Sequence, residues 1–203
     1  DATNGATVSR INVTANSYNL QSTLTQVTTG LTLSNTGIIN ISGSNVLRMS
    51  NSAGGNGNGN PLLTSYGFIK AGTGELMFSQ PFSFYNSGLS GPIYINGGTV
   101  TIGDKSNTNN PNLYLHNNDF FLNDGKFTIA AANSANSGLG FFKSLTVDGT
   151  GTNNSAIELY NTGTAASLYT EPTTDDRYPQ LAIDLLPLSI KGTLSVGYGG
   201  NTN

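Results

Sequence analysis

The feature that most constrains this chain is a short alternating motif that recurs along it. A few residues alternate between apolar and polar, and a Gly, Asn or Asp follows. Period-two alternation places one face of a strand in a core and the other in water. Gly and Asn separators favour turns, because they adopt left-handed backbone conformations at low steric cost. The motif predicts strands at residues 11–13, 31–33, 39–41, 76–78, 93–95, 100–102, 113–115, 127–129, 145–147, 157–159 and 194–196.

The spacing of these strands favours a solenoid over a sandwich or a barrel. Sandwich and barrel strands are usually longer, with turns about 8–12 residues apart, whereas residues 31–33, 39–41 and 46–49 follow one another more closely. A coil with about three faces needs such spacing, because each strand turns a corner onto the next. Successive coils would stack about 4.8 Å apart by parallel pairing. At roughly 20–25 residues per coil, we expect one all-β solenoid domain over residues 1–203, with roughly eight to ten rungs.

Composition excludes several classes of protein. Only 9% of residues are charged and the net charge is −3, so nucleic acid and anionic membranes are not expected partners. Nine Tyr and nine Phe argue against disorder. The absence of Cys excludes a disulfide scaffold, a thiolate zinc site and a cysteine nucleophile. No apolar run approaches the roughly 20 residues of a membrane span, and the chain opens at Asp1, so we interpret it as a processed or trimmed form.

One segment has the composition of a helix but contains a proline. Residues 180–190 (QLAIDLLPLSI) include Pro187, and proline inside a helix costs about 3 kcal/mol. We therefore predict two strands there, at residues 181–185 and 188–190. Gly- and Asn-rich segments predict loops at residues 53–60, 106–112 and 148–154. A linker between domains is the alternative for residues 53–60.

The most informative segment is residues 67–103. It begins GFIKAGTGELMF, continues through Tyr85 and Gly88, and ends IYINGGTVTIG. This segment resembles the autotransporter-associated β-strand repeat, whose pattern is Gly-Leu-x-Lys-x-Gly-x-Gly-x-Leu-x-Leu, an aromatic residue and a Gly, then a hydrophobic strand and Gly-Gly-x-Leu-x-Leu-Gly. Some apolar residues here stand where the pattern has Leu. The positions that carry the resemblance are Gly67, Lys70, Gly72, Gly74, Leu76, Phe78, Gly97, Gly98, Val100, Ile102 and Gly103.

The resemblance covers about a fifth of the chain, and it implies a right-handed parallel β-helix exported to the exterior of a bacterial cell. It does not imply one activity, because such passenger domains serve as adhesins, toxins, enzymes or stalks. A fragment of a longer passenger and a freestanding secreted protein both stay open. Within the segment, glycines allow corners after residue 70 and before residue 99. We expect Lys70 and Glu75 to point outward as a surface ion pair that contributes well under about 1 kcal/mol.

Candidate catalytic and metal-binding residues are few. Clustered Asp with Lys or Arg serves catalysis in polysaccharide-acting β-helix enzymes, and Asp175, Asp176 and Arg177 are the nearest equivalent. Adjacent residues on a strand point to opposite faces, so we expect a solvated loop there and no enzyme. The single His116 argues against zinc. Asp119 and Asp124 are weak candidate calcium ligands, without an EF-hand or repeated calcium motif.

Two functional classes remain. The first is a non-catalytic extracellular or cell-surface protein with a structural or adhesive role, which binds a glycan or a host-surface protein. Tyr66, Tyr85, Tyr160 and Tyr169 are candidate contacts, although each fits a coil corner equally well. The second class is a self-assembling subunit of an extracellular filament. Residues 6–13 already resemble a strand and no cap helix precedes them, so open strand edges would pair with another copy.

Overall fold

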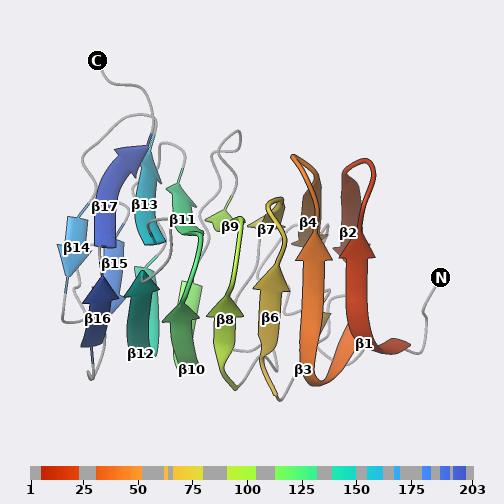
Figure 1. The fold of residues 1–203 in the computed structure, drawn as a ribbon, viewed down its shortest axis with the longest axis horizontal. Coiled ribbons are helices and arrows are strands. Elements are labelled where there is room, and N and C mark those ends of the chain that lie inside the picture. Colours follow the sequence, from red (N-terminus) through yellow and green to blue (C-terminus); the bar gives the residue numbers. More distant parts are fainter. Residues whose placement is uncertain are drawn as a thin grey trace.

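The computed structural model describes residues 6–22, 31–51, 62–63, 66–79, 91–103, 113–131, 139–149, 155–161, 167–169, 180–183, 188–192 and 194–199. Within these ranges every regular element is a β-strand and none is a helix. Figure 1 shows the strands side by side along the long axis, roughly in chain order. The predicted all-β class is therefore confirmed for the described residues.

The strands form two sheets in which every pairing is parallel. The first sheet has ten strands, in the order β1 (Ala6–Val13), β3 (Leu31–Ile41), β6 (Phe68–Ala71), β8 (Ile93–Ile95), β10 (Leu113–Leu122), β12 (Leu139–Gly149), β15 (Gln180–Ile183) and β14 (Ser167–Tyr169), while β5 (Leu62–Leu63) pairs with β3 and β16 (Leu188–Gly192) with β12. The second sheet has seven, in the order β17 (Leu194–Gly199), β13 (Ser155–Asn161), β11 (Lys126–Ala131), β9 (Thr99–Gly103), β7 (Glu75–Ser79), β4 (Val46–Asn51) and β2 (Tyr18–Ser22).

The chain passes repeatedly from the first sheet to the second. The successive pairs are β1 and β2, β3 and β4, β6 and β7, β8 and β9, β10 and β11, β12 and β13, and β16 and β17. Each new strand pairs with the equivalent strand of the preceding pass. Parallel pairing between successive passes is the arrangement that a β-solenoid requires, so the parallel sheets of the prediction are confirmed.

The interval between paired residues exceeds the expected 20–25 residues in several passes. Ile41 pairs with Val13 at an interval of 28 residues, and Ala71 pairs with Asn40 at an interval of 31. Later in the chain, Ile190 pairs with Val147 at an interval of 43. Other passes are close to the expected interval, as between Phe68 and Ile93, which are 25 residues apart. The second sheet has seven described strands, and the predicted number of eight to ten rungs stays a prediction.

The alternation located the strands well. The segments predicted from alternation fall within strands of the structure. In residues 180–190 the structure has β15 and β16 and no helix, although residues 184 and 185 of the predicted strand 181–185 lie outside the described residues. The expected strand over residues 6–13 is β1. Residues 31–33 and 39–41 form one long strand, β3, rather than two, with Asn35 in a left-handed conformation (φ 51°) between them. The strands β2, β5 and β14 were not predicted. β2 (YNLQS) alternates over only two apolar residues, and β5 (LL) and β14 (SLY) do not alternate.

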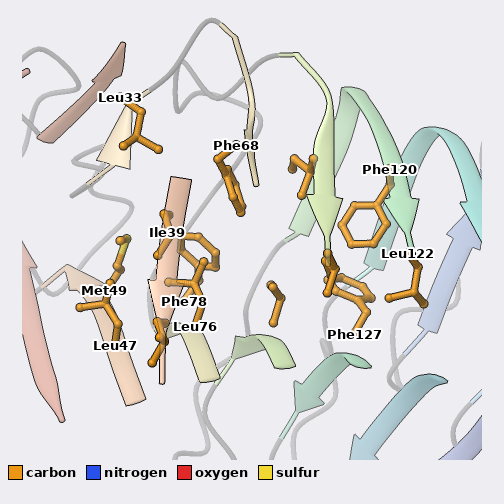
Figure 2. Close-up of a cluster of buried hydrophobic side chains, with 14 of the residues drawn as sticks. Leu33, Ile39, Leu47, Met49, Phe68, Leu76, Phe78, Phe120, Leu122 and Phe127 are labelled. Atoms are coloured by element: carbon orange, nitrogen blue, oxygen red, sulfur yellow. The ribbon is translucent and has the colours of Figure 1, made fainter. Parts of the chain in front are cut away.

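The core lies between the two sheets and runs through successive passes. Figure 2 shows how side chains such as Phe68, Phe78 and Phe120 fill this interior. Phe120 and Phe127 pack edge to face with ring centroids 4.8 Å apart. The buried cluster consists of Val13, Leu33, Ile39, Ile41, Leu47, Met49, Phe68, Leu76, Phe78, Ile93, Ile95, Val100, Phe120, Leu122, Phe127, Val147 and Ile157.

Candidate functional site

Lys70 is a charged residue at a core position of the first sheet. Strand pairing aligns it with Ile39 on one side and Ile95 on the other, and Leu122 continues the same column. All four side chains are 0% exposed. The prediction that Lys70 points outward is therefore wrong. Its neighbours in β6 give the physical reason, because Phe68 is buried and every second residue of a strand shares one face.

The ammonium group of Lys70 is satisfied by backbone carbonyls. Nζ donates to the carbonyl oxygens of Ala71 at 2.9 Å, Gly72 at 3.0 Å and Gly97 at 3.0 Å. A lysine ammonium has three donors, so these bonds use all of them. Burial lowers the pKa of Lys70 to about 8, which leaves the charged form dominant at pH 7. Lys70 thus joins the corner of its own pass to the corner of the next.

Glycines allow these corners to stack directly on one another. Gly72 and Gly98 have φ values of 75° and 67°. A Cβ on Gly98 would lie 2.3 Å from the carbonyl oxygen of Gly74, which also accepts a bond from Thr99 N at 3.2 Å. A side chain at residue 98 would therefore push two successive corners apart. This contact supplies the physical reason for glycine at the corner positions of the repeat-like segment.

The other repeat-like positions lie in corners and in the core. Gly67 precedes β6, with a φ of 75° and the carbonyl of Pro92 directly against it. Leu76, Phe78 and Val100 are buried in the core. Ile102 and Gly103 lie in β9, where they pair with Phe78 and Ala130. The structure thus gathers these residues into two adjacent passes.

Glu75 interacts with a hydroxyl group instead of with Lys70. The hydroxyl of Thr101 donates to its carboxylate, and Thr128, which pairs with Thr101, donates to Glu158 at 3.0 Å. Thr101 and Thr128 alternate with core residues and are nevertheless 0% exposed. The expected Lys70–Glu75 ion pair is therefore wrong, because all three Lys70 donors bind carbonyls. A surface ion pair does form on β11, where Lys126 contacts Glu158 at 3.1 Å.

The candidate metal ligands do not converge in the described residues. Asp119 lies in β10, and Asp124 lies in the turn between β10 and β11, where its N–H donates to the Ile95 carbonyl at 3.1 Å. Across the described ranges, no group of three or more His, Asp or Glu side chains could hold a metal ion. His116 lies in β10, but its side chain is outside the described ones. Calcium binding stays an untested prediction.

The candidate catalytic segment cannot be placed. Asp175, Asp176 and Arg177 lie outside the described residues. Among the candidate contact tyrosines, Tyr66 is 57% exposed beside the Gly67 corner. Tyr85 lies outside the described residues, while Tyr160 and Tyr169 lie in β13 and β14 without described side chains.

The outer face of the first sheet carries residues that the sequence reasoning missed. Ile38, Ile69, Tyr94 and Phe121 align in register and are all partly exposed. The rings of Tyr94 and Phe121 stack with centroids 4.7 Å apart and planes 14° apart. In each strand the sequence does show an apolar residue between two core positions. That these residues align into one column on the outer face follows only once the pairing of the passes is known.

Comparisons with known proteins do not identify a relative. No family model matches the chain, and neither a curated protein nor a solved structure shows significant similarity to it. The likeness of residues 67–103 to the autotransporter repeat therefore depends on the motif alone. In the part of the chain that the structure describes, no helix is long and apolar enough to cross a membrane.

Proposed function

We propose that this chain is a non-catalytic extracellular or cell-surface protein, a right-handed parallel β-helix with a structural or adhesive role. The observation that supports the proposal best is the parallel pairing of successive passes in two sheets around one apolar core. Such a scaffold is long and rigid and presents flat outer faces. The repeat-like segment supports the same proposal, because its lysine and glycines form the stacked corners.

The proposal is tested on purified protein and on the cells that produce it. We expect small-angle X-ray scattering to give an elongated particle, and antibodies against the chain to label intact, unpermeabilised cells. A compact sphere in solution would contradict the β-helix, and labelling only after permeabilisation would contradict the surface location. A hydrolytic or lyase activity toward polysaccharides would contradict the non-catalytic role.

A second candidate function is a subunit of a filament. It is favoured by the exposure of residues in β1 and β2, whose pairing partners in the next pass are buried. Tyr18 is 53% exposed, whereas Leu47, its partner in the next pass, is 1% exposed. Ile11 is likewise partly exposed, whereas its partner Ile39 is 0% exposed. In the described part of the chain, β1 and β2 are edge strands, and an uncovered edge can pair with another copy. Electron microscopy and light scattering test this function, and monodisperse monomers at high concentration would exclude it.

A further inference from the structure

The outer face of the first sheet presents two adjacent columns of side chains that cross the passes. The first, which we name the apolar column, consists of Ile38, Ile69, Tyr94 and Phe121. Each of the four is partly exposed, and each lies between two buried residues of its own strand. Parallel strands lie about 4.7–4.9 Å apart, so the column offers one apolar group at that interval along the long axis.

The second column carries side-chain amides. We name it the amide column: Asn40, Asn96 and Asn123, with Ala71 between the first two. Asn40 pairs with Ala71, and Asn96 and Asn123 follow the paired residues Ile95 and Leu122. Nδ2 of Asn123 donates to Oδ1 of Asn96 at 2.7 Å, and the Asn96 side chain is exposed. Asn96 and Asn123 begin the corners after β8 and β10, so the amide column lies at the ends of these strands, beside the apolar column.

Some side-chain donors and acceptors of the amide column are not used by the bond within it. Each Asn side chain has two N–H donors and a carbonyl oxygen with two lone pairs. The bond between Asn123 and Asn96 uses one donor and one lone pair. Both Asn96 donors and the Asn123 carbonyl have no other partner in the described part of the chain, so a ligand on this face can receive and supply hydrogen bonds at successive passes.

The two columns carry no formal charge from Ile38 to Phe121 and from Asn40 to Asn123. An anionic ligand would find no cation within them, and a cationic ligand would find carboxylates only beside the last members, where Asp119 lies two residues before Phe121 and Asp124 follows Asn123. A ligand that matches this face is neutral, extended along the axis, and has an apolar side beside a row of hydroxyl groups. An extended chain of neutral, β-linked sugars has these properties, and one of its sugar residues is close in length to one strand spacing.

We propose that the apolar and amide columns form a binding site for a neutral, extended polysaccharide. The sugar hydroxyls bond to Asn96 and Asn123, and the C–H groups of the sugar rings lie against Tyr94 and Phe121. The chain of sugars runs across the strands, parallel to the long axis. This inference rests on the adhesive form of the function proposed above and names the ligand class for it.

The test measures binding of the whole chain to cellulose and chitin by depletion from solution, and to xylan by affinity electrophoresis. We expect binding to at least one of these three neutral polysaccharides. Affinity should be nearly independent of NaCl concentration, because no ion pair forms. The double variant Asn96→Ala/Asn123→Ala should bind about tenfold more weakly or worse, because it removes the directed hydrogen bonds. Tyr94→Ala should weaken binding as well.

Two controls keep the test decisive. Tyr18→Ala removes an exposed aromatic residue from the other sheet, so it should bind like the unchanged chain. The amide variant changes an exposed position and a partly exposed one, and an unchanged thermal unfolding curve would show that its fold is intact.

Four results would overturn the proposal. These are no binding to any of the three polysaccharides, equal binding by the amide variant, binding only to the acidic polysaccharide alginate, and concentration-dependent self-association that the amide variant abolishes. The last result would assign the face to a second copy of the chain. None of them bears on particle shape or surface labelling, so failure of this inference is distinguishable from failure of the proposed function.

Discussion

Two corners between the sheets have similar backbone conformations but different surroundings. The corner after β3, residues 42–45, contains Gly43 with a φ of 64°, and a Cβ there would meet nothing within 4 Å. The corner after β8, residues 96–98, contains Gly98 with a φ of 67°, and a Cβ there would lie 2.3 Å from a carbonyl oxygen. At the first corner the space beside Gly43 is open, although the corner also bonds to the next pass, where Thr73 Oγ1 donates to the Gly43 carbonyl at 3.1 Å. Its own side chain, Asn45, closes the turn by a bond to the Ser42 carbonyl. The second is stacked on its neighbour and bonded through Lys70. The comparison shows that glycine serves conformation at one corner and close approach at the other.

The largest effect should come from adding a methyl group at the stacked corner. Gly98→Ala places a Cβ against Gly74 and Gly72, in addition to the left-handed backbone. We expect a loss of more than about 3 kcal/mol in the free energy of unfolding, since overpacking and backbone strain combine. Urea unfolding measures it.

Gly43→Ala is the matched control, because it has the same kind of backbone and no contact. Its cost should be about 1 kcal/mol, from the left-handed conformation alone. Equal losses in the free energy of unfolding for the two variants would show that the close contact between the corners does not contribute to stability.

The next effect concerns the ammonium group that joins the stacked corners. Lys70→Met keeps the apolar stem but leaves the carbonyls of Ala71, Gly72 and Gly97 without their donor. We expect a loss of about 2–4 kcal/mol, because three partly buried acceptors lose charge-assisted bonds. Leu122→Met, in the same column, should cost less than about 1.5 kcal/mol. A Lys70→Met chain as stable as the unchanged one would mean that the carbonyls find other donors.

A pH titration tests the same group without a change of shape in the folded chain. The pKa of Lys70 is lowered to about 8 in the folded chain, against 10.5 as its ordinary value. Between these values the unfolded chain binds more protons, so the free energy of unfolding rises with pH by up to about 3 kcal/mol. The measurement is the difference in stability between the unchanged chain and Lys70→Met from pH 7 to 10.5. A flat or falling difference would contradict the burial of the ammonium.

At the corner after β3, the loss of the Asn45 side chain should lower the free energy of unfolding by a smaller amount. Nδ2 of Asn45 donates to the carbonyl oxygen of Ser42 at 2.7 Å, and the N–H of Asn45 bonds to the same oxygen at 3.3 Å. Asn45→Ala removes the shorter bond and keeps the longer one, so we expect a loss of about 1 kcal/mol in thermal or urea unfolding. A loss as large as that of Lys70→Met would show that both corners depend equally on their side-chain hydrogen bonds.

The sequence predicted the strands but not the way in which the passes meet. Alternation within a strand is local, so β7, β8 and β9 could be located from a few residues each. The same alternation places Lys70 beside Phe68 on the inner face, but its charge favoured a surface interpretation. The buried ammonium is satisfied in part by the carbonyl of Gly97, which lies 27 residues further along the chain, so a local pattern could not predict this bond. The stacking of Tyr94 on Phe121 depends on the same register, which no local pattern specifies.

The smallest effect should come from the lysine that does form an ion pair. Lys126 contacts Glu158 at 3.1 Å, with side chains 37% and 21% exposed, so water and salt screen the attraction. Lys126→Met should cost less than about 1 kcal/mol, and the difference should shrink in 1 M NaCl. Lys70→Met should keep most of its cost in the same salt, because the Lys70 side chain is buried and its partners are neutral carbonyls. If both lysine variants responded equally to salt, the Lys70 ammonium would be open to water, and the contrast between the buried lysine and the surface lysine would fail.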